Sequence, residues 1–566
     1  MFRNKCVSIV FCVLNFAFAA LAQVNNGGEI VEIVESFNNK EYSKTIKLSK
    51  MALDKNPAND AVNYYLGMAY FSNKENELAE VYLRKAEELD STNFWYKQRL
   101  ATLYTFTKEY PKAISVYEKI MRDFPKKHEI YYNLVELYLS QNQQEKALNT
   151  LEQIDLVFGT TEATVMLKYD ILRRLNKLDE AVEVLREFNE EHSSIRVLAS
   201  LGDYEVSVNN DSTALAYYDE ALSLEPNFPT ALFGKAEVFR MTRRFDEYFD
   251  PLNKFISFPE LNPQWKSRYL TTVISNADQS FIRNYRHKFD NTMNVLVKAH
   301  PKDSSALKSA AMYFLAIKDT VKTKELYEKY SESYKDDPKV REEYLGLLMY
   351  LKDWKKLSES SQKSYADFPQ ENQFYDYNSY AEFSLKNYEK VLEILEIILN
   401  KNKGNDVKYA DAYSLMGDVY YQQGEKSKAY RAYEKSLRYV SDNIGVLNNY
   451  AYYLSLDKKK LKKAEVMSRK TIEMEPDNST YLDTYGWILH LLGKSEEAKT
   501  HFKRAMIYGG KENVEVVDHY AEVLYSLGEY DLAMYYWRNA ISINNGEIKD
   551  LEAKVKLRNL NREKNK

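Results

Sequence analysis

Histidines and paired carboxylates are the side chains of this sequence that could bind a metal or transfer protons. Seven histidines are present, at positions 128, 192, 287, 300, 490, 501 and 519. None belongs to a His-Glu-x-x-His pattern, which places two zinc ligands on one face of a helix. His490 and His501 are eleven residues apart in the sequence. A metal site would need a third ligand, and each histidine ligand would need an acceptor for its other ring N–H. We therefore interpret the histidines as packing residues and predict neither a metal nor a cofactor.

The segment from Gly486 to Ser495 ends in Gly-Lys-Ser and has some likeness to a phosphate-binding loop. Such a loop has four residues between its glycines, whereas six residues of a mostly apolar helix separate Gly486 from Gly493. The sequence also lacks the Gly-x-Ser-x-Gly pattern of many hydrolases. We therefore predict that the protein is not an enzyme. The alternative is a catalytic site in the irregular middle of the chain, where His287 and His300 lie among scattered acids.

The elements that position these side chains are helices that repeat about every 34 residues, from just after residue 25 almost to the end. In the repeat Ala410–Asn443, a bulky–small pair (Met416-Gly417) is followed by a small residue, Ala429, and a large one, Tyr433. Small residues allow helices to approach closely, and prolines near the end of several repeats stop the second helix. Apolar residues at three- and four-residue steps indicate helix throughout. A period of this length indicates a solenoid of helix pairs.

These repeats resemble the tetratricopeptide repeat (TPR) family. The resemblance implies an all-α, right-handed superhelical solenoid of about 14–15 helix-turn-helix units. Units are expected to begin near residues 26, 60, 94, 128, 162, 195, 229, 270, 304, 338, 372, 410, 444, 479 and 514. The match weakens between about 260 and 405, where Thr323, Leu357 and Val391 replace the usual alanine and extra residues occur around Leu261–Ser280. We interpret this stretch as diverged repeats rather than an insertion with its own role.

Residues 1–22 have the features of a cleaved secretory signal peptide. Arg3 and Lys5 precede an apolar run, and Ala20-Leu21-Ala22 supplies the cleavage site. We expect export to the periplasm and a mature chain that begins at Gln23. The mature protein is expected to be soluble there or associated with the cell envelope. Both cysteines, at positions 6 and 12, lie in this segment, so the mature chain has no thiol for disulfides or metal binding.

The remaining chain is divided by the strength of the repeat pattern. We predict an N-terminal TPR array at 23–262, diverged repeats at 263–405, a C-terminal TPR array at 406–546, and a capping helix with a charged tail at 547–566. The apolar side of that last helix is expected to consist of Leu551, Val555, Leu557 and Leu560.

The resemblance also implies which residues could bind a partner, because helix A of each TPR unit lines a concave groove. In the C-terminal units these places hold acids, amides and aromatics: Asp411, Asp418, Tyr421, Asn448, Tyr452, Asp483, Trp487, Asp518, Glu522 and Tyr525. Since an unpaired carboxylate is costly to bury, we expect the acids to be exposed. We predict that they bind a positively charged or amide-rich protein segment, with Trp487 and Tyr452 as aromatic anchors.

Charge and hydropathy limit the partners further. The net charge of −4 offers no basic excess for nucleic acid, and no second long apolar run follows the signal peptide. We predict a non-catalytic scaffold or adaptor of the bacterial periplasm or cell envelope that binds a peptide or protein segment. A solenoid that binds polysaccharide or cell wall is the alternative, with Tyr64, Trp95 and Tyr132 as its candidate groove aromatics.

Overall fold

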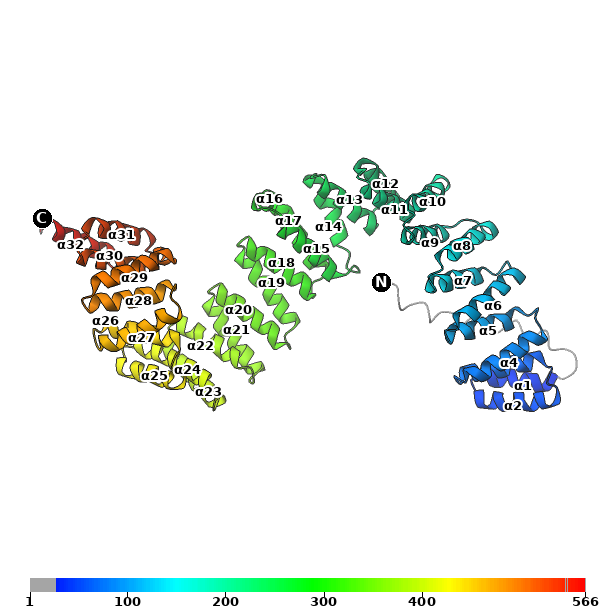
Figure 1. The fold of residues 1–566 in the computed structure, drawn as a ribbon, viewed down its shortest axis with the longest axis horizontal. Coiled ribbons are helices and arrows are strands. Elements are labelled where there is room, and N and C mark those ends of the chain that lie inside the picture. The colour runs from blue at the N-terminus through cyan, green and yellow to red at the C-terminus, as the bar shows by residue number, and fades with distance from the viewer. Residues whose placement is uncertain (1–26, 545, 547, 565–566) are drawn as a thin grey trace. The chain divides into compact units, whose positions relative to one another are not determined.

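The computed structural model describes residues 27–544, 546 and 548–564, and within them the chain forms helices and no strands (Figure 1). The helices follow one another in pairs, and we call the first of each pair helix A and the second helix B. The predicted signal peptide lies outside the described residues. The prediction of an all-α array of TPR-like helix pairs is confirmed.

The chain divides into two compact units. The first extends to Glu260 and includes Arg286–Val295, while the second comprises Leu261–Tyr285 and the chain from Leu296 onward. The helices up to Glu260 are α1 (Gly27–Asn38), α2 (Tyr42–Lys55), α3 (Asp60–Ser72), α4 (Asn76–Leu89), α5 (Phe94–Phe106), α6 (Tyr110–Asp123), α7 (His128–Ser140), α8 (Gln144–Phe158), α9 (Glu162–Arg174), α10 (Leu178–Glu191), α11 (Ile195–Ser207), α12 (Asp211–Leu224), α13 (Pro229–Met241) and α14 (Phe245–Ile256).

The remaining helices continue the same alternation with one interruption. They are α15 (Pro263–Ser275), α16 (Gln279–Asn284), α17 (Arg286–Ala299), α18 (Ser304–Ala316), α19 (Thr320–Ser333), α20 (Pro338–Tyr350), α21 (Trp354–Asp367), α22 (Asn372–Ser384), α23 (Tyr388–Lys401), α24 (Asp406–Gln422), α25 (Lys426–Tyr439), α26 (Ile444–Leu456), α27 (Leu461–Met474), α28 (Ser479–Leu491), α29 (Ser495–Ile507), the 3₁₀ turn η1 (Gly510–Glu512), α30 (Val514–Ser526), α31 (Tyr530–Ile543) and α32 (Leu551–Lys564). None of the helices in the described residues is long and apolar enough to cross a membrane.

Helix A begins within a few residues of each expected unit start, except at residue 270. That expectation is wrong, because α15 already begins at Pro263. The Asn262 side chain accepts a hydrogen bond from the Gln264 backbone N–H at 2.9 Å, and proline is well suited to the first helical position. The extra residues of this region form the short helix α16, which lies in sequence between helix A (α15) and helix B (α17).

Small residues position the two helices of a unit against each other. A Cβ atom placed on Gly417 of α24 would lie 2.4 Å from Cε1 of Tyr433 in α25. The same relation holds between Gly486 and Phe502, where the corresponding distance to Cε2 is 2.8 Å. Both pairs are sixteen residues apart, so the glycine of helix A makes room for a large side chain of its own helix B.

The weakly matching stretch is built from the same helix pairs. Thr323, Leu357 and Val391 are each fully buried, at the place on helix B that alanine holds in other units. A larger side chain at this place fills space that the helices would otherwise close by moving together. The sequence pattern is therefore weak here although the pairs α18–α19, α20–α21 and α22–α23 are regular.

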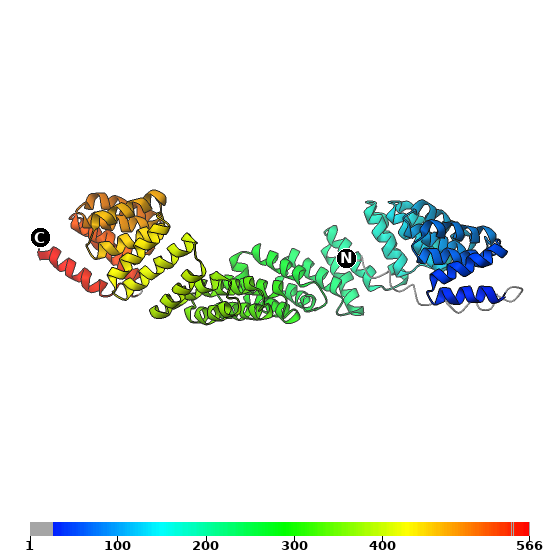
Figure 2. The same cartoon turned by 90° about the horizontal axis from the view of Figure 1, so that it is seen from below.

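Helix α32 follows the last helix pair (Figure 2). Leu551 and Val555, one turn apart, are buried, with 1% and 6% of their surface exposed. Leu557 and Leu560 are 60% and 47% exposed, so the expectation that all four residues form one apolar side is wrong. The buried side of α32 instead carries Leu551 and Val555 beside two cations, which are described below.

Candidate functional site

The ten predicted binding residues lie on four consecutive A helices, α24, α26, α28 and α30. We call the surface formed by these helices together with the preceding A helix, α22, the helix-A surface. Direct side-chain contacts join neighbouring A helices along it, and these contacts decide which of the predicted residues are available to a partner.

At the C-terminal end, α32 supplies cations to the acids of α30. Lys554 Nζ lies 2.7 Å from both carboxylate oxygens of Asp518 and 2.9 Å from Glu522 Oε1. Arg558 Nη2 lies 2.9 Å from Glu522 Oε2, and the Tyr525 hydroxyl donates to the Arg558 carbonyl oxygen at 3.0 Å. Asp518 and Glu522 are 6% and 8% exposed, so the expectation that they are exposed is wrong. They can be buried because these cations compensate their charge.

The next contact joins α28 to α30. Asp483 is 5% exposed, and its Oδ1 lies 2.9 Å from Nδ1 of His519, so the expectation that Asp483 is exposed is also wrong. The His519 ring stacks on the Trp487 indole at 4.2 Å and an angle of 15°. Burial by itself would lower the pKa of His519, but Asp483, with Glu515 and Asp518, outweighs that effect and raises the pKa.

Tyr452 of α26 completes this group. Its hydroxyl donates to the Glu515 carboxylate on α30, and its ring centroid is 6.4 Å from that of His519. Tyr452, Trp487 and His519 therefore form one aromatic group that spans three A helices. His519 was not among the predicted residues, although its position 36 residues after Asp483 matches the separation between Asp518 and Lys554.

The α24 part of the surface is different. Asp418 Oδ1 accepts hydrogen bonds from the Tyr433 hydroxyl at 2.6 Å and, at 3.5 Å, from Asn449 Nδ2. Burial raises the pKa of Asp418 to about 6, and the two hydrogen bonds only partly oppose this rise. Asp411 is exposed as expected, whereas Asp418 is only partly exposed, so the expectation that Asp418 is exposed is wrong. Tyr421 stacks on Tyr453 with ring centroids 3.7 Å apart.

On α24, α26, α28 and α30, two buried polar atoms have no hydrogen-bond partner among the described residues. They are Oδ1 of Asn448 and Nε1 of Trp487, and both residues were predicted from the sequence. Asn448 is 6% exposed. Because a buried polar atom that lacks a partner costs free energy, such atoms in a folded protein call for an explanation.

The residues of the two alternative functions lie on other helices. Tyr64, Trp95 and Tyr132 are half-buried and pack against the core of the N-terminal helices. His300 is 8% exposed, with Nε2 3.0 Å from Nζ of the buried Lys266; burial and this neighbouring ammonium lower the His300 pKa. His287 is exposed on α17. No group of three histidine, aspartate, glutamate or cysteine side chains in the described part of the chain could hold a metal ion.

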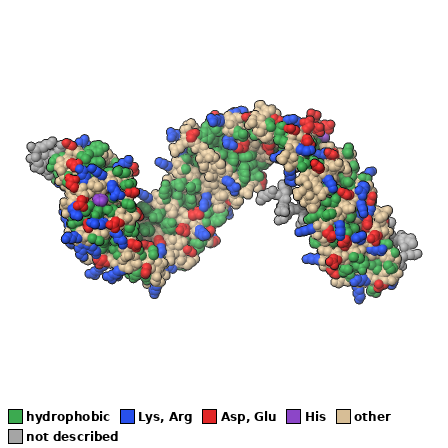
Figure 3. All heavy atoms as spheres, in the orientation of Figure 1, with side chains coloured by type: hydrophobic (Ala, Val, Ile, Leu, Met, Phe, Trp, Pro, Cys, Tyr) green, Lys and Arg blue, Asp and Glu red, His purple; other side chains and the backbone are tan. Residues whose placement is uncertain are grey.

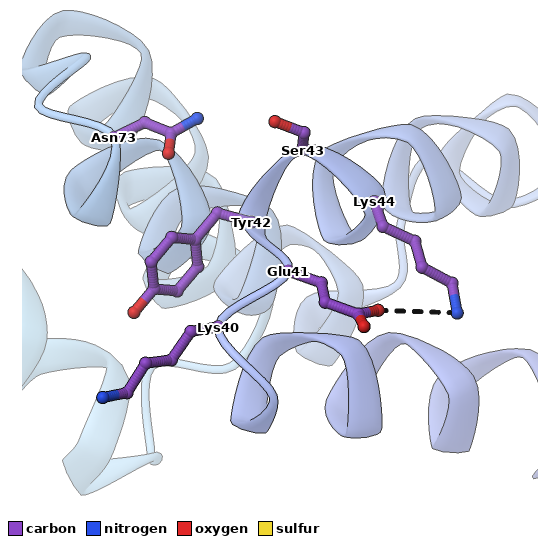
Figure 4. Close-up of a pocket in the computed structure, with 6 residues that line it drawn as sticks. All are labelled: Lys40, Glu41, Tyr42, Ser43, Lys44 and Asn73. Carbon is purple, nitrogen blue, oxygen red and sulfur yellow. Dashed lines mark ion pairs between the residues drawn. The ribbon is translucent and has the colours of Figure 1, made fainter.

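Two surface hollows lie on the N-terminal helices. One, of about 430 Å³, lies where α1 turns into α2 and is lined by Lys40, Glu41, Tyr42, Ser43, Lys44 and Asn73 (Figure 4). Its charges partly cancel, because Lys44 Nζ lies 3.7 Å from Glu41 Oε2. On the face that Figure 3 presents, acidic, basic and hydrophobic side chains are likewise interspersed over the C-terminal helices.

Two curated proteins show limited similarity to this chain. Anaphase-promoting complex subunit 3 of Schizosaccharomyces pombe is 23% identical over 145 residues, which cover 26% of this chain and 22% of that protein. TPR repeat-containing protein YpiA of Bacillus subtilis is 23% identical over 252 residues, which cover 42% of this chain and 57% of that protein. The chain thus spans only part of the length of either relative.

Solved structures of three helical-repeat proteins are also similar. They are Naa15/Naa10 bound to HypK-THB (TM-score 0.33, 13% identity, 94% of this chain and 96% of that chain), the APC/C hetero-tetramer Cut9-Hcn1 (0.36, 13%, 81% and 96%) and yeast Tom70 (0.31, 14%, 90% and 97%). Similarity at these TM-scores carries no argument about function.

Family models agree with the helix pairs. A tetratricopeptide repeat model matches residues 315–543, which include part of the weakly matching stretch. Two further tetratricopeptide repeat models match residues 107–168 and 61–93. Together with the regular A and B helices, these matches show that the chain belongs to the tetratricopeptide repeat family.

Proposed function

We propose that this protein is a non-catalytic scaffold or adaptor that binds a protein or peptide segment on the helix-A surface of its C-terminal units. The observation that carries the proposal is the aromatic group of Tyr452, Trp487 and His519, which spans three A helices. Tyr452 and Trp487 are partly exposed, so a bound segment can pack against them.

The fold supports the same function. Tetratricopeptide repeat solenoids are typical of protein-binding scaffolds, because stacked units present a long continuous surface. The aromatic group of Tyr452, Trp487 and His519 provides rigid side chains of the type that dominate protein interfaces. Asp483, Asp518 and Glu522 are buried, so they are not available to a partner. The acids that are exposed or partly exposed on the helix-A surface are Asp411 and Asp418 of α24.

We further propose that the protein works in the bacterial periplasm or at the cell envelope. This part rests on the sequence of residues 1–22. Mass spectrometry of the native protein should find Gln23 at the mature N-terminus, in the soluble or loosely bound envelope fraction. An intact Met1 on the native protein would contradict export.

The binding proposal is tested by site-specific photo-crosslinking in the native cell. A photoreactive residue at Asp411 places the probe on the helix-A surface, and one at Val466, which is 65% exposed on helix B (α27), is the matched control. We expect the probe at Asp411 to capture the same partner in independent preparations, and the probe at Val466 not to capture it. Equal capture at both positions, or none at Asp411, would contradict binding at this surface.

A further inference from the structure

Two acids at the C-terminal end of the helix-A surface converge on a pair of cations from α32. Lys554 Nζ lies within 2.9 Å of both the Asp518 and the Glu522 carboxylate, and Arg558 Nη2 lies 2.9 Å from Glu522 Oε2. Lys554 and Arg558 are four residues apart, so both extend from one face of their helix. The acids of α30 therefore form a site that holds a helix with two cations one turn apart.

Other groups of α30 and α31 complete this site. The Arg558 guanidinium lies over the Tyr525 ring, 5.2 Å from its centroid, in a cation–π contact. The Tyr525 hydroxyl donates to the Arg558 carbonyl oxygen at 3.0 Å, and Trp537 Nε1 donates to Asp518 Oδ1 at 2.8 Å. The site thus contacts a basic helix through its charges, an aromatic ring and one backbone oxygen.

The apolar packing of α32 is small compared with that of its neighbour. Among residues 551–560, only Leu551 and Val555 are buried, whereas α30 buries ten residues. Leu557 and Leu560 are largely exposed, and the C-terminal end of α32, drawn in red, projects beyond the last helix pair (Figure 2). The ion pairs therefore carry a large share of the contact between α32 and the array.

These ion pairs are open to solvent on the side of the cations. The side chains of Lys554 and Arg558 are 34% and 41% exposed, whereas those of Asp518 and Glu522 are 9% and 10% exposed. Because water and salt ions reach the cations, they weaken the attraction that holds α32 in place. When α32 leaves, both acids become hydrated, and another helix can then bind them.

The same acids lie beside the aromatic group of the helix-A surface. The ring centroids of Trp487 and His490, both on α28, are 5.3 Å apart. Burial lowers the pKa of His490; the Glu522 carboxylate opposes this effect and the Arg558 guanidinium adds to it, so both charges act on the ring. Departure of α32 would therefore extend the available surface from Trp487 past His490 to Glu522.

We propose that α32 is a displaceable strap that occupies, within its own chain, a site on α30 for a basic helix of the protein partner. The partner helix carries two cations four residues apart, in the spacing of Lys554 and Arg558. A tethered helix competes at a high effective concentration, so the strap reduces the partner's affinity by the fraction of molecules in which the site is open. This inference rests on the proposed function and specifies the chemistry of the partner and its regulation.

Peptide binding to the full-length mature protein tests the strap. The probe is a fluorescently labelled peptide with the sequence of residues 549–564, and fluorescence anisotropy measures its dissociation constant. Lys554→Gln with Arg558→Gln in the protein weakens its own α32 and leaves the acids unchanged, so this variant should bind the peptide at least about tenfold more tightly than the wild type. A peptide with the same two substitutions should bind the variant at least about tenfold more weakly than the original peptide.

A matched variant separates the strap from a general effect of charge. Lys549→Gln with Lys556→Gln removes two exposed cations of the same segment and changes the net charge equally. It should bind the peptide as the wild type does. Equal binding of the peptide to the wild type and to the Lys554→Gln/Arg558→Gln variant, or equal binding of the two peptides, overturns the inference.

Hydrogen–deuterium exchange measures whether α32 leaves without unfolding its neighbours. In the wild type, α32 should exchange at least about tenfold faster than α30 and α31, and the Lys554→Gln/Arg558→Gln variant should keep the wild-type protection of these two helices. Equal exchange of the three helices, or loss of protection in α30 and α31 of the variant, would show that α32 is a fixed part of the array and would overturn the inference. Capture of a partner by photo-crosslinking at Asp411 would still support the proposed function in that case.

Discussion

The partly buried carboxylate of Asp418 leads to a quantitative prediction of how stability depends on pH. Its pKa is about 6 in the folded chain, against the ordinary value of 3.8 for an aspartate. The folded state therefore favours the protonated form, and the associated stability is fully present below pH 3.8 and is lost as the pH rises through 6. The difference of about 2 pKa units corresponds to about 3 kcal/mol of local stability between these limits.

Hydrogen–deuterium exchange, corrected for the intrinsic pH dependence of amide exchange, measures this loss in α24 and α25. A local measurement is needed because a long repeat array does not unfold as one two-state unit. In the wild type, the free energy of local opening should fall by about 2.5 kcal/mol between about pH 4 and pH 7.5. Asp418→Asn should remove most of this slope, because asparagine does not titrate and still accepts the Tyr433 hydrogen bond.

The control variant Asp442→Asn, in the exposed turn between α25 and α26, should keep the wild-type slope in α24 and α25. A wild-type opening free energy that is constant over this pH range would show that Asp418 is better solvated or better paired than the structure indicates. The same slope in wild type and Asp418→Asn would assign the pH dependence to another group. Either result refutes the reasoning that burial without a cation raises the pKa of Asp418.

Three further predictions concern packing and charge. Gly417→Ala should destabilise α24 and α25 by about 2 kcal/mol or more, because its Cβ would overlap the fully buried Tyr433 ring. Gly346→Ala, whose Cβ would make only an ordinary contact at 3.5 Å, should stabilise α20 by about 0.5–1 kcal/mol. Local hydrogen exchange of the two variants tests both values. His519 has a raised pKa, so the stability it adds to α28 and α30 is present below pH 6.5 and is lost as the pH rises through its folded pKa; His519→Gln should abolish this dependence, and an unchanged pH profile would contradict it. The weakly matching stretch, about 260–405, should exchange amide hydrogens faster than the repeats on either side, and uniform protection would argue against it.

The helix pairs could be predicted well from the sequence because small and large residues recur in it at fixed spacings. Gly417 and Tyr433 are sixteen residues apart, and the same relation recurs in other units, so a reader of the sequence finds the pattern without any structure. The unit that begins at Pro263 was misplaced because its start depends on a local cap by Asn262. A single cap has no periodic signal and is easily masked by the extra residues of α16.

The candidate site was only partly predictable, because its residues interact across units. Asp518 looked like an exposed groove acid when its own helix was considered alone. Its charge partner, Lys554, lies 36 residues later on α32, and Trp537 Nε1 of helix B donates to Asp518 Oδ1 at 2.8 Å. The separation that joins Asp518 to Lys554 also joins Asp483 to His519, so a search for opposite charges one repeat apart would have found both pairs.

The contacts between successive A helices also bear on how such an array can change in evolution. Apolar packing follows the same plan in the regular units, so duplication or loss of one such unit would preserve the core. The polar contacts are specific to each junction: Asp483 meets a histidine, Asp518 meets a lysine, and Asp418 meets an asparagine. Deleting or exchanging a whole unit would therefore bring mismatched polar groups together at the new junction. The order of the C-terminal units is accordingly held in place by their charged residues, even where their hydrophobic residues would permit rearrangement.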